Sequence, residues 1–449
     1  MRIFNAPILV FSVLIAGLAQ PQILVESHKL RAVSVSSNTL LGYSIDVKDG
    51  LVVLGGPGTD NSGLPGAAYL FASNGEQLHN LDPGTLLVGD RFGFAVATDG
   101  HKVVVGAPRH DTNQIDDGAV YVFDARFGTL LFILSIENLP QGAEFGSSVA
   151  VSNGLIAVGA RHDNGERSNT GSVYLFDSDT GEYIAKIVSD DGSAGDGFGV
   201  SVAMAGGYIV VGAQFDDDNG TASGSAYIYS VTTLAQLHKL LPHDGDGEHN
   251  FGISVDTDGI HTVVGARFAD KCGYRSGSAY LFDNTTGMEL NQFIPLDCRS
   301  DVWFGHSVSI DSGLVLAGTI FDRHEPGISG AAYVFDVATG SQLRKLIASD
   351  SMPNDWLGYS VAISNGLAAC GARGNDEASF NAGAGYLFEI WGPLCLPDTN
   401  HDGVLSPADF SAWVAAFNTQ SPACDQNSDG SCTPADFSAW VANYNAGCP

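Results

Sequence analysis

The chain has 449 residues, of which 50 are acidic and 20 are basic, so its formal net charge at pH 7 is −30. Such a charge repels nucleic-acid phosphates and anionic membranes, so we expect neither as a partner. Glycine is abundant at 56 residues, yet hydrophobic residues make up 44% of the chain, which indicates a folded protein rich in turns rather than a disordered one.

The N-terminal segment resembles a secretory signal. One arginine precedes an apolar stretch over residues 6–15, and small residues follow it. This order predicts cleavage between Ala19 and Gln20, with residues 1–19 removed. An uncut membrane anchor is the alternative. No apolar stretch reaches the length of a bilayer span, so we expect a secreted or cell-surface protein without a membrane span in its mature form.

Residues 20–390 repeat one pattern. A Phe-Gly or Leu-Gly step, an alternating apolar run, a Gly-Ala step, an acidic loop and Gly-x-x-Tyr-x-Phe, or close variants of these, follow one another seven times. The first glycines are separated by 51 residues once and by 53 residues five times. They are Gly42, Gly93, Gly146, Gly199, Gly252, Gly305 and Gly358. This self-similarity indicates stacked units within one architecture.

Each repeat predicts four short strands, because β-branched and aromatic runs alternate with turn residues. The first connection always has Gly as its second residue, which is typical of a two-residue hairpin with positive φ. We therefore expect seven tight hairpins, at Asp49-Gly50, Asp99-Gly100, Asn153-Gly154, Gly206-Gly207, Asp258-Gly259, Ser312-Gly313 and Asn365-Gly366. Four antiparallel strands per unit are the blade of a β-propeller.

The ends of the repeat region favour a closed ring. The last repeat stops near residue 390 after three strands, whereas residues 28–33 resemble the fourth strands at 237–240 and 343–346. The N-terminal segment therefore supplies the missing strand. The sequence predicts an all-β, seven-bladed β-propeller of four-stranded blades, followed by a small α-helical domain.

Phe92-Gly93 and the later Gly106-Ala107-Pro108 make this chain similar to the FG-GAP repeat of the integrin α-subunit propeller. The resemblance extends over about residues 28–390. It implies a surface for a protein or glycan ligand on the face that carries the loops after the second strands. Many family members have a calcium loop between the first two strands, but hairpins are expected here, so calcium is not carried over to those positions.

That loop face is rich in acidic residues. They are Asp60, Asp111, Asp163, Asp216, Asp217, Asp218, Asp270, Asp322 and Asp376, with Asp190, Asp191, Asp244, Asp246 and Glu248 from the crossovers between blades. A ligand surface and loops that are acidic only to stay solvated are both open interpretations. Local capture of a metal by residues 243–248 is a third.

Residues 391–397 form a linker to a tail, 398–449, that contains one motif twice. Each copy places oxygen ligands at positions 1, 3, 5, 7 and 12 of a loop with Gly at position 6, which is the spacing of a Ca²⁺ loop. The expected ligands are Asp398, Asn400, Asp402, Val404 and Asp409, and then Asp425, Asn427, Asp429, Ser431 and Asp436. From residue 395 onward there are six Asp and no Glu, Lys or Arg, so we expect calcium to drive folding of the tail. A fortuitous acidic turn is the alternative.

A helix is expected after each loop, with Ser406 or Thr433 as its cap. Apolar residues at helical spacing, most of them aromatic, predict a core between the two helices; they are Phe410, Trp413, Val414 and Phe417, and Phe437, Trp440, Val441 and Tyr444. Two such loop-and-helix units with a Gly-Cys-Pro end resemble a dockerin. The resemblance implies a cohesin-like or surface scaffold partner, contacted by Pro407, Ala408, Pro434 and Ala435. These residues are less polar than the usual Ser-Thr pair, which leaves the partner open.

Seven cysteines in an exported chain indicate disulfides with one thiol left over. Cys272 and Cys298 lie in connections that emerge on the same face of a meander, so we expect a bond between them. The four tail cysteines allow three pairings, of which we favour Cys395–Cys448 with Cys424–Cys432. Cys370 lies in an apolar run, which predicts a buried thiol.

No catalytic residue is proposed, because the chain contains no Gly-x-Ser-x-Gly elbow, His-Glu-x-x-His helix or phosphate loop. We expect a monomeric binding or adhesion propeller displayed through its tail. A dockerin-borne polysaccharide hydrolase or lyase and a structural envelope component are the alternatives. Two or three carboxylates about 5–9 Å apart in a cleft would favour the hydrolase.

Overall fold

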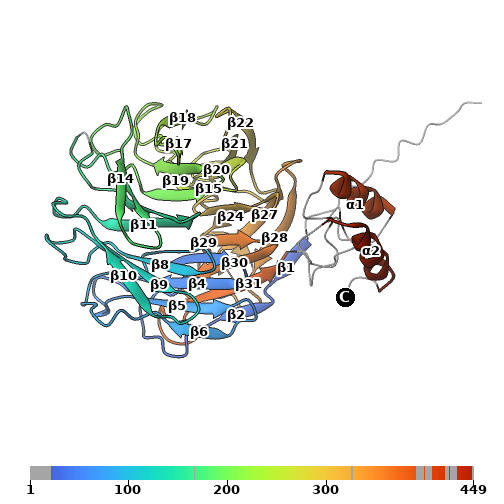
Figure 1. Ribbon diagram of the computed structural model, residues 1–449, viewed down its shortest axis with the longest axis horizontal. Coiled ribbons are helices and arrows are strands. Elements are labelled where there is room, and N and C mark those ends of the chain that lie inside the picture. The colour runs from blue at the N-terminus through green and yellow to red at the C-terminus, as the bar shows by residue number, and fades with distance from the viewer. Residues whose placement is uncertain are drawn as a thin grey trace, which may run out of the picture.

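The structure, a computed structural model, describes residues 22–165, 167–324, 327–390, 399, 407–419, 424 and 432–446. Seven blades, each built on four antiparallel strands, follow one another in a β-propeller, and a fifth strand joins the sheet of blade six (Figure 1). In six blades the four strands occur in chain order, and in the seventh the outermost strand comes from the start of the chain. The predicted all-β, seven-bladed fold is therefore confirmed.

Blades one to three follow chain order. Blade one contains β3 (Ser44–Lys48), β4 (Leu51–Gly56), β5 (Ala67–Ala72) and β6 (Gln77–Asn80). Blade two contains β7 (Ala95–Thr98), β8 (Lys102–Ala107), β9 (Ala119–Asp124) and β10 (Leu130–Leu134). Blade three contains β11 (Phe145–Ser152), β12 (Leu155–Ala160), β13 (Ser172–Asp177) and β14 (Tyr183–Ile187).

Blades four to six continue the same order. Blade four contains β15 (Ser201–Ala205), β16 (Tyr208–Ala213), β17 (Ser225–Ser230) and β18 (Gln236–Leu240). Blade five contains β19 (Phe251–Thr257), β20 (His261–Ala266), β21 (Ser278–Asp283) and β22 (Glu289–Phe293). Blade six contains β23 (Val308–Asp311), β24 (Leu314–Thr319), β27 (Ala331–Asp336) and β28 (Gln342–Ile347). A short hairpin, β25 (Arg323–His324) and β26 (Gly327–Ile328), extends from its loop.

Blade seven combines both ends of the propeller. It contains β29 (Leu357–Ser364), β30 (Leu367–Ala372), β31 (Ala384–Glu389) and β2 (His28–Leu30). β2 pairs antiparallel with β31, so the N-terminal segment supplies the missing strand, over a shorter span than the predicted 28–33. The sequence did not reveal β1 (Gln22–Val25), which pairs parallel with β28 and makes blade six five-stranded (Figure 1). The N-terminal segment thus joins blades six and seven.

The expectation of seven two-residue hairpins is correct for five blades and wrong for two. In blade two Thr98 pairs with Val103, and in blade five Thr257 pairs with Thr262, so each connection has four unpaired residues. The cause is one extra residue between the Gly and the apolar run. In both loops the aspartate that precedes the Gly accepts backbone N–H bonds that close the turn.

The Phe-Gly and Gly-Ala steps are where neighbouring blades meet. A Cβ on Gly159 of blade three would lie 2.1 Å from the carbonyl oxygen of Gly199 in blade four. Any side chain at position 159 would therefore keep blades three and four from packing this closely. Gly199 also has a φ of +87°, which favours glycine. Ser148 Oγ donates to the same Gly199 oxygen at 2.8 Å. The repeat motif is thus explained by blade packing.

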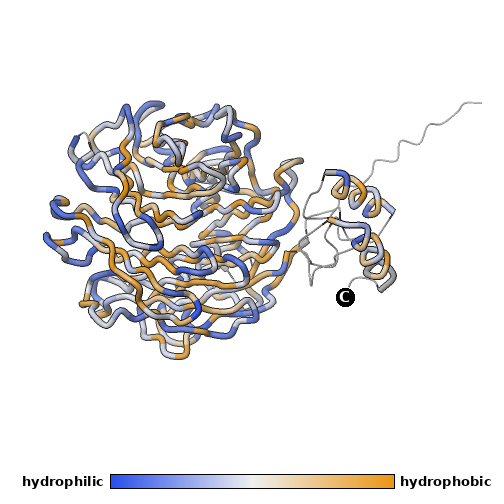
Figure 2. The backbone as a smooth tube through the Cα atoms, in the orientation of Figure 1, coloured by the Kyte–Doolittle hydropathy of each residue, from blue (hydrophilic) through white to orange (hydrophobic). Residues whose placement is uncertain are grey.

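The apolar core lies between adjacent blades rather than within one sheet. Each hydrophobic cluster combines the middle strands of two neighbours, for example Val53 and Leu70 of blade one with Tyr121 and Phe123 of blade two. Phe92 of the Phe-Gly step meets the Tyr121 ring edge-on, with ring centroids 5.4 Å apart. Figure 2 shows hydrophobic strands and mostly hydrophilic connecting loops. Each blade therefore needs both neighbours to bury its surface.

The described part of the tail contains two helices, α1 (Pro407–Thr419) and α2 (Pro434–Ala446). Trp413 and Trp440 are buried, as expected of a core between them. Phe410 contacts Trp440 and Phe437 contacts Trp413 across the two helices, with ring centroids 5.2 Å and 5.6 Å apart. Both phenylalanines are nevertheless 40% and 44% exposed, and Val414 and Val441 are 37% and 36% exposed, so these four lie at the edge of the core. The reason is that two helices can bury only one stripe of each other. Among the described residues no helix is long and apolar enough to cross a membrane.

Candidate functional site

The first strands of the seven blades surround a central channel. Their side chains line a cavity of about 520 Å³ that extends toward the hairpins between first and second strands. We call that end the hairpin face and the opposite end, which carries the loops after the second strands, the loop face. Most lining side chains are small or aliphatic, and five are aspartates. Asp99, Asp258 and Asp311 lie at or beside the hairpins, whereas Asp46 in blade one and Asp256 in blade five lie within first strands.

Asp46 and Asp256 connect neighbouring blades. Asp46 accepts the backbone N–H of Thr98 in blade two at 2.7 Å, and Asp256 accepts that of Ile310 in blade six at 2.8 Å. Ser309 Oγ also donates to Asp256, at 2.8 Å. Burial raises the pKa of Asp46 to about 7 and that of Asp256 to about 6, against the opposing effect of these hydrogen bonds. The two carboxyl groups therefore connect neighbouring blades through hydrogen bonds, and their raised pKa values mean that they ionise less readily than an exposed aspartate.

Three acids that were expected to shape the loop face are instead buried inside it. Asp163, Asp216 and Asp322 are 2%, 3% and 2% exposed. Each accepts the hydroxyl of the third-strand tyrosine in its own blade: Tyr174 at 2.6 Å, Tyr227 at 3.0 Å and Tyr333 at 2.7 Å. A fourth-strand lysine lies beside each: Lys186 at 2.7 Å, Lys239 at 3.0 Å and Lys345 at 3.0 Å. These acids are structural parts of their blades.

Other loop acids close the loops in which they lie. Their Oδ1 atoms accept the backbone N–H of the residue five positions later, which has a positive φ. The pairs are Asp111 with Asp116, Asp217 with Ala222, Asp270 with Arg275 and Asp376 with Asn381. Asp190, Asp246 and Glu248 are exposed. Neither of the two main sequence interpretations is sufficient, because most of these acids have internal roles.

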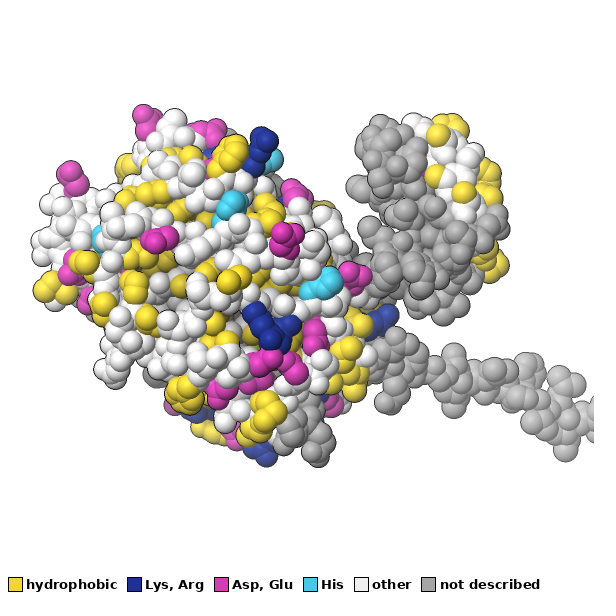
Figure 3. Space-filling view, turned by 90° about the horizontal axis from the view of Figure 1, so that it is seen from below, with side chains coloured by type: hydrophobic (Ala, Val, Ile, Leu, Met, Phe, Trp, Pro, Cys, Tyr) yellow, Lys and Arg dark blue, Asp and Glu magenta, His cyan; other side chains and the backbone are white. Residues whose placement is uncertain are grey.

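The run 243–248 does not gather its side chains on one point. His243 pairs with Glu289 at 2.7 Å, whereas Asp244 accepts from Tyr280 at 2.8 Å and pairs with Lys271 at 3.0 Å. Across the part of the chain that the structure describes, no group of three or more His, Cys, Asp or Glu side chains could hold a metal ion. On the face drawn in Figure 3, a central group of Lys and Arg side chains lies against acidic ones.

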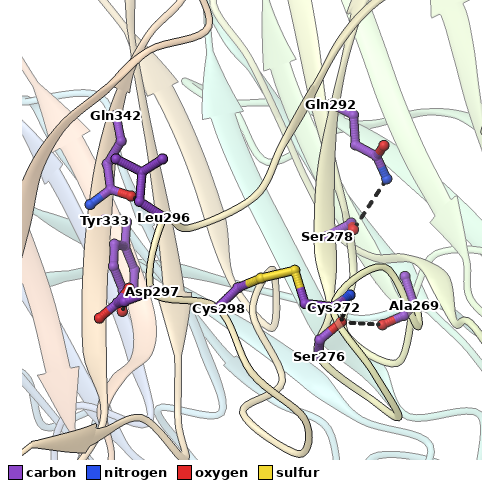
Figure 4. The surroundings of a disulfide bond; sticks show 10 residues. All are labelled: Ala269, Cys272, Ser276, Ser278, Gln292, Leu296, Asp297, Cys298, Tyr333 and Gln342. Atoms are coloured by element: carbon purple, nitrogen blue, oxygen red, sulfur yellow. Dashed lines mark hydrogen bonds between the residues drawn. A yellow bond between two sulfur atoms is a disulfide. The ribbon is translucent and has the colours of Figure 1, made fainter. Parts of the chain in front are cut away.

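The predicted bond between Cys272 and Cys298 is present, with Cα atoms 6.1 Å apart. It ties the loop after β20 to the crossover that leads into blade six (Figure 4). In that crossover Asp297 accepts the Tyr333 hydroxyl at 2.9 Å. Cys370 is a buried free thiol, as expected, and burial raises its pKa. The disulfide therefore fixes a crossover whose neighbouring acid is part of a blade interior.

At the loop-face end of the channel the structure brings together a group that the sequence did not predict. We call it the axial cluster: Tyr43, His306, Tyr359, Arg267 and Arg373. Tyr43, His306 and Tyr359 directly follow the Phe-Gly or Leu-Gly steps of blades one, six and seven, and the two arginines directly follow the Gly-Ala steps of blades five and seven. The motif gave each position, but only closure of the ring brings them together.

The rings of the axial cluster contact one another around the propeller axis. The Tyr43 and Tyr359 centroids are 5.0 Å apart, and those of His306 and Tyr359 are 4.8 Å apart. The Arg373 guanidinium lies 4.1 Å from the Tyr359 centroid and 4.7 Å from that of Trp356. All of these side chains are half-buried, so solvent reaches them. They form a partly exposed surface of aromatic rings and two guanidinium groups at the centre of the loop face.

Most of the predicted tail site lies outside the described residues. This holds for Asp398, Asn400, Asp402, Val404, Asp425, Asn427, Asp429 and Ser431, and also for Cys395, Cys448, Ala19 and Gln20. The predicted bond between Cys424 and Cys432 is present. The remaining proposed ligands, Asp409 and Asp436, are both fully buried in the first turns of their helices.

Asp436 also completes a helix cap. Its Oδ2 accepts the Thr433 backbone N–H at 2.8 Å and the Thr433 hydroxyl at 3.1 Å. Residues 395–449 contain no Lys or Arg and one histidine, His401, so no permanently cationic side chain of the tail can balance its two buried carboxylates. This donor set fits a calcium ion. The four residues predicted to contact a partner, Pro407, Ala408, Pro434 and Ala435, are exposed.

The family model of the FG-GAP repeat matches residues 86–123, 139–176, 182–229, 234–282, 288–335 and 341–388. These segments fall on blades two to seven, and blade one has the same architecture. No curated protein matches the chain significantly. Because the matched segments cover more than half of the sequence, the chain belongs to the FG-GAP repeat family.

Proposed function

We propose that this protein is an exported propeller that binds a ligand on its loop face and is held on a scaffold or cell surface by its calcium-dependent, dockerin-like tail. The propeller fold of this family supports a binding or adhesion role. The two disulfides of the described residues fit an oxidising compartment outside the cytosol.

One observation carries the display part of the proposal. Asp409 and Asp436 are fully buried, at equivalent positions of two helices, in a tail that contains no Lys or Arg. Burial of an ionised carboxylate is costly unless a cation or hydrogen bonds compensate for lost hydration. Calcium bound by the two loops would supply that positive charge. Cohesin-like recognition then falls to exposed residues of the first turns, Pro407 and Ala408 with Pro434 and Ala435.

An apolar patch beside those residues supports a partner surface. Phe410 and Val414 on α1, and Phe437 and Val441 on α2, are all between 36% and 44% exposed. The two pairs occupy equivalent positions of the repeated sequence. Exposed aromatic and aliphatic side chains next to one another are typical of a protein contact rather than of a solvated surface.

Calcium titration of the full chain tests this proposal. We expect calorimetry to give two bound Ca²⁺ per chain, with a Kd in the range of extracellular modules, about 10⁻⁴–10⁻³ M. Asp409→Asn with Asp436→Asn should weaken uptake at least tenfold. Asp190→Asn, which removes an exposed propeller carboxylate, should leave it unchanged.

The display itself is tested by fractionation. The full chain should sediment with the cell envelope of the producing organism in calcium and be released by EGTA, and the double tail variant should stay in the supernatant. Absence of calcium uptake at millimolar concentration, or sedimentation that ignores EGTA, would contradict the proposal.

A polysaccharide hydrolase or lyase is the second candidate, because Asp46 and Asp256 share one cavity and have raised pKa values. Against it, each carboxylate already accepts backbone N–H groups that join blades. We expect no release of reducing ends from a panel of polysaccharides. Release that is lost in Asp256→Asn would replace the binding proposal by the enzymatic one.

A further inference from the structure

We propose that the axial cluster binds a carboxylate group of a polypeptide partner, with Arg267 and Arg373 as the charged contacts and the surrounding rings as the apolar ones. This inference names the ligand class for the loop-face binding proposed above and rests on it. It is argued from charge balance, from polar groups without partners, and from the composition of the surface.

The first argument is charge balance. The chain has 50 acidic and 20 basic residues, so a basic side chain can easily find an acidic neighbour. Lys29, Lys102, Lys186, Lys239, Lys271 and Lys345 all do so. Among the described residues, neither Arg267 nor Arg373 lies within ion-pair distance of a carboxylate, although both are half-buried. Two desolvated cations without an anion favour capture of one.

The second argument concerns polar atoms. Nε of Arg267, Nε of Arg373, Nδ1 of His306 and Nε1 of Trp356 are buried and have no hydrogen-bond partner in the described part of the chain. Buried donors of this kind are rare in folded proteins, and each carries a cost. Here they occur together, within one cluster. A ligand with acceptor oxygens would satisfy several of them at once.

The third argument is that the positive charges converge. Arg267 and Arg373, from blades five and seven, lie on either side of His306, and both lower its pKa together with burial, to about 3. Burial also lowers the pKa of Arg267 itself. His306 is therefore neutral at pH 7, and the local excess charge comes from the two guanidinium groups. A planar carboxylate matches the forked geometry of a guanidinium.

The surface around these charges favours a protein over a polyanion. The ring centroids of Trp303 and Phe321 are 4.6 Å apart, and the rings of Trp356 and Tyr359 both contact the Arg373 guanidinium. Trp, Tyr and Arg side chains therefore occupy the centre of the loop face. These are the residue types that dominate binding energy at the centres of protein interfaces. A nucleic acid or a polyuronate would meet long-range repulsion from the net charge of −30. A single side-chain or C-terminal carboxylate on a peptide would not.

A peptide array tests the inference on the full chain in calcium. The probes are acetylated, amidated dodecapeptides that contain Asp or Glu, each with a matched Asn or Gln counterpart, together with oligouronates. We expect acidic peptides to bind at least tenfold more tightly than their amide counterparts. Arg267→Gln with Arg373→Gln should abolish that difference. Arg126→Gln, at an exposed arginine that also lies over an aromatic ring, is the matched control and should bind like the wild type.

Further readouts keep the test decisive. If the double variant does not fold, Arg373→Lys keeps the charge without the fork, and its affinity should fall below the wild type but stay above that of Arg373→Gln. Equal binding of acid and amide peptides, equal loss in the Arg126→Gln control, or binding of oligouronates without peptides would each overturn the inference. EGTA should leave peptide binding intact, because the axial cluster needs no calcium. Failure of the tail proposal would therefore be distinguishable from failure of this inference.

Discussion

The propeller and the tail both bury aspartates, but they balance them in different ways. In blade four the buried Asp216 receives the Tyr227 hydroxyl and the Lys239 ammonium. In the tail the buried Asp409 and Asp436 belong to a segment without Lys or Arg. The propeller thus balances a buried aspartate with its own side chains, whereas for the tail we propose an external cation. Acidic motifs are informative only together with the basic residues near them.

Removal of the lysine that balances a buried aspartate should lower the stability of the propeller. Lys239→Met leaves Asp216 buried at 3% exposure without its ammonium partner, and it also releases Asp191. We expect a loss of about 3 kcal/mol in the free energy of unfolding of the propeller. Urea denaturation followed by near-UV circular dichroism measures it.

Lys48→Met is the control for that experiment, because Lys48 is exposed on the hairpin face. It should change the stability by less than about 0.5 kcal/mol. Equal effects of the two substitutions would mean that the buried cluster contributes nothing beyond ordinary surface charge.

The disulfide of the propeller offers a covalent comparison with its charge clusters. The bond between Cys272 and Cys298 closes a loop of 26 residues, so its removal by Cys272→Ser with Cys298→Ser should cost about 2–3 kcal/mol through the unfolded chain. Calorimetric unfolding in the presence and absence of reductant checks this. A wild type that is insensitive to reductant, with an equally stable double variant, would show that the ring alone fixes this crossover.

The two aspartates of the channel should make the stability of the propeller depend on pH. The pKa values of Asp46 and Asp256 are raised from 3.8 to about 7 and about 6, so the folded state holds these protons more tightly than the unfolded state. The stabilisation is present in full below about pH 4 and is lost as the pH rises toward 7. We expect the two groups together to make the propeller about 4 kcal/mol less stable at pH 8 than at pH 5.

Asp46→Asn with Asp256→Asn provides the check on that slope. Melting temperatures between pH 5 and 8 should vary less in this variant than in the wild type. An identical pH dependence would assign the effect to other groups.

Much of the fold followed from the period of the repeat, because identical blades must pack in the same way. Local rules also gave the disulfides at Cys272 and Cys424, which join connections that are close along the chain or on one face. β1 escaped prediction, since its parallel pairing with β28 links segments more than 300 residues apart with no shared pattern. The loop acids were misjudged for the same reason, because their partners lie on strands that only tertiary structure brings near.

The candidate site shows where such reasoning ends. Tyr43 and Tyr359 occupy repeat positions that are visible in the sequence, but their contact across the first and last blades exists only because the ring closes. Among the described residues no carboxylate lies within ion-pair distance of Arg373, and this too is a property of the three-dimensional structure. The sequence gives the net negative charge of the chain. It does not show which of the few basic residues have no acidic neighbour in the folded protein.

Hydrogen exchange of the full chain, with calcium and then with excess EGTA, tests most directly whether the two regions differ in their need for a cation. We predict that amides of α1 and α2 lose protection on chelation, whereas those of β16 and β17 in blade four stay protected. Helices that keep their protection in EGTA, or blades that lose it together with them, would contradict this account.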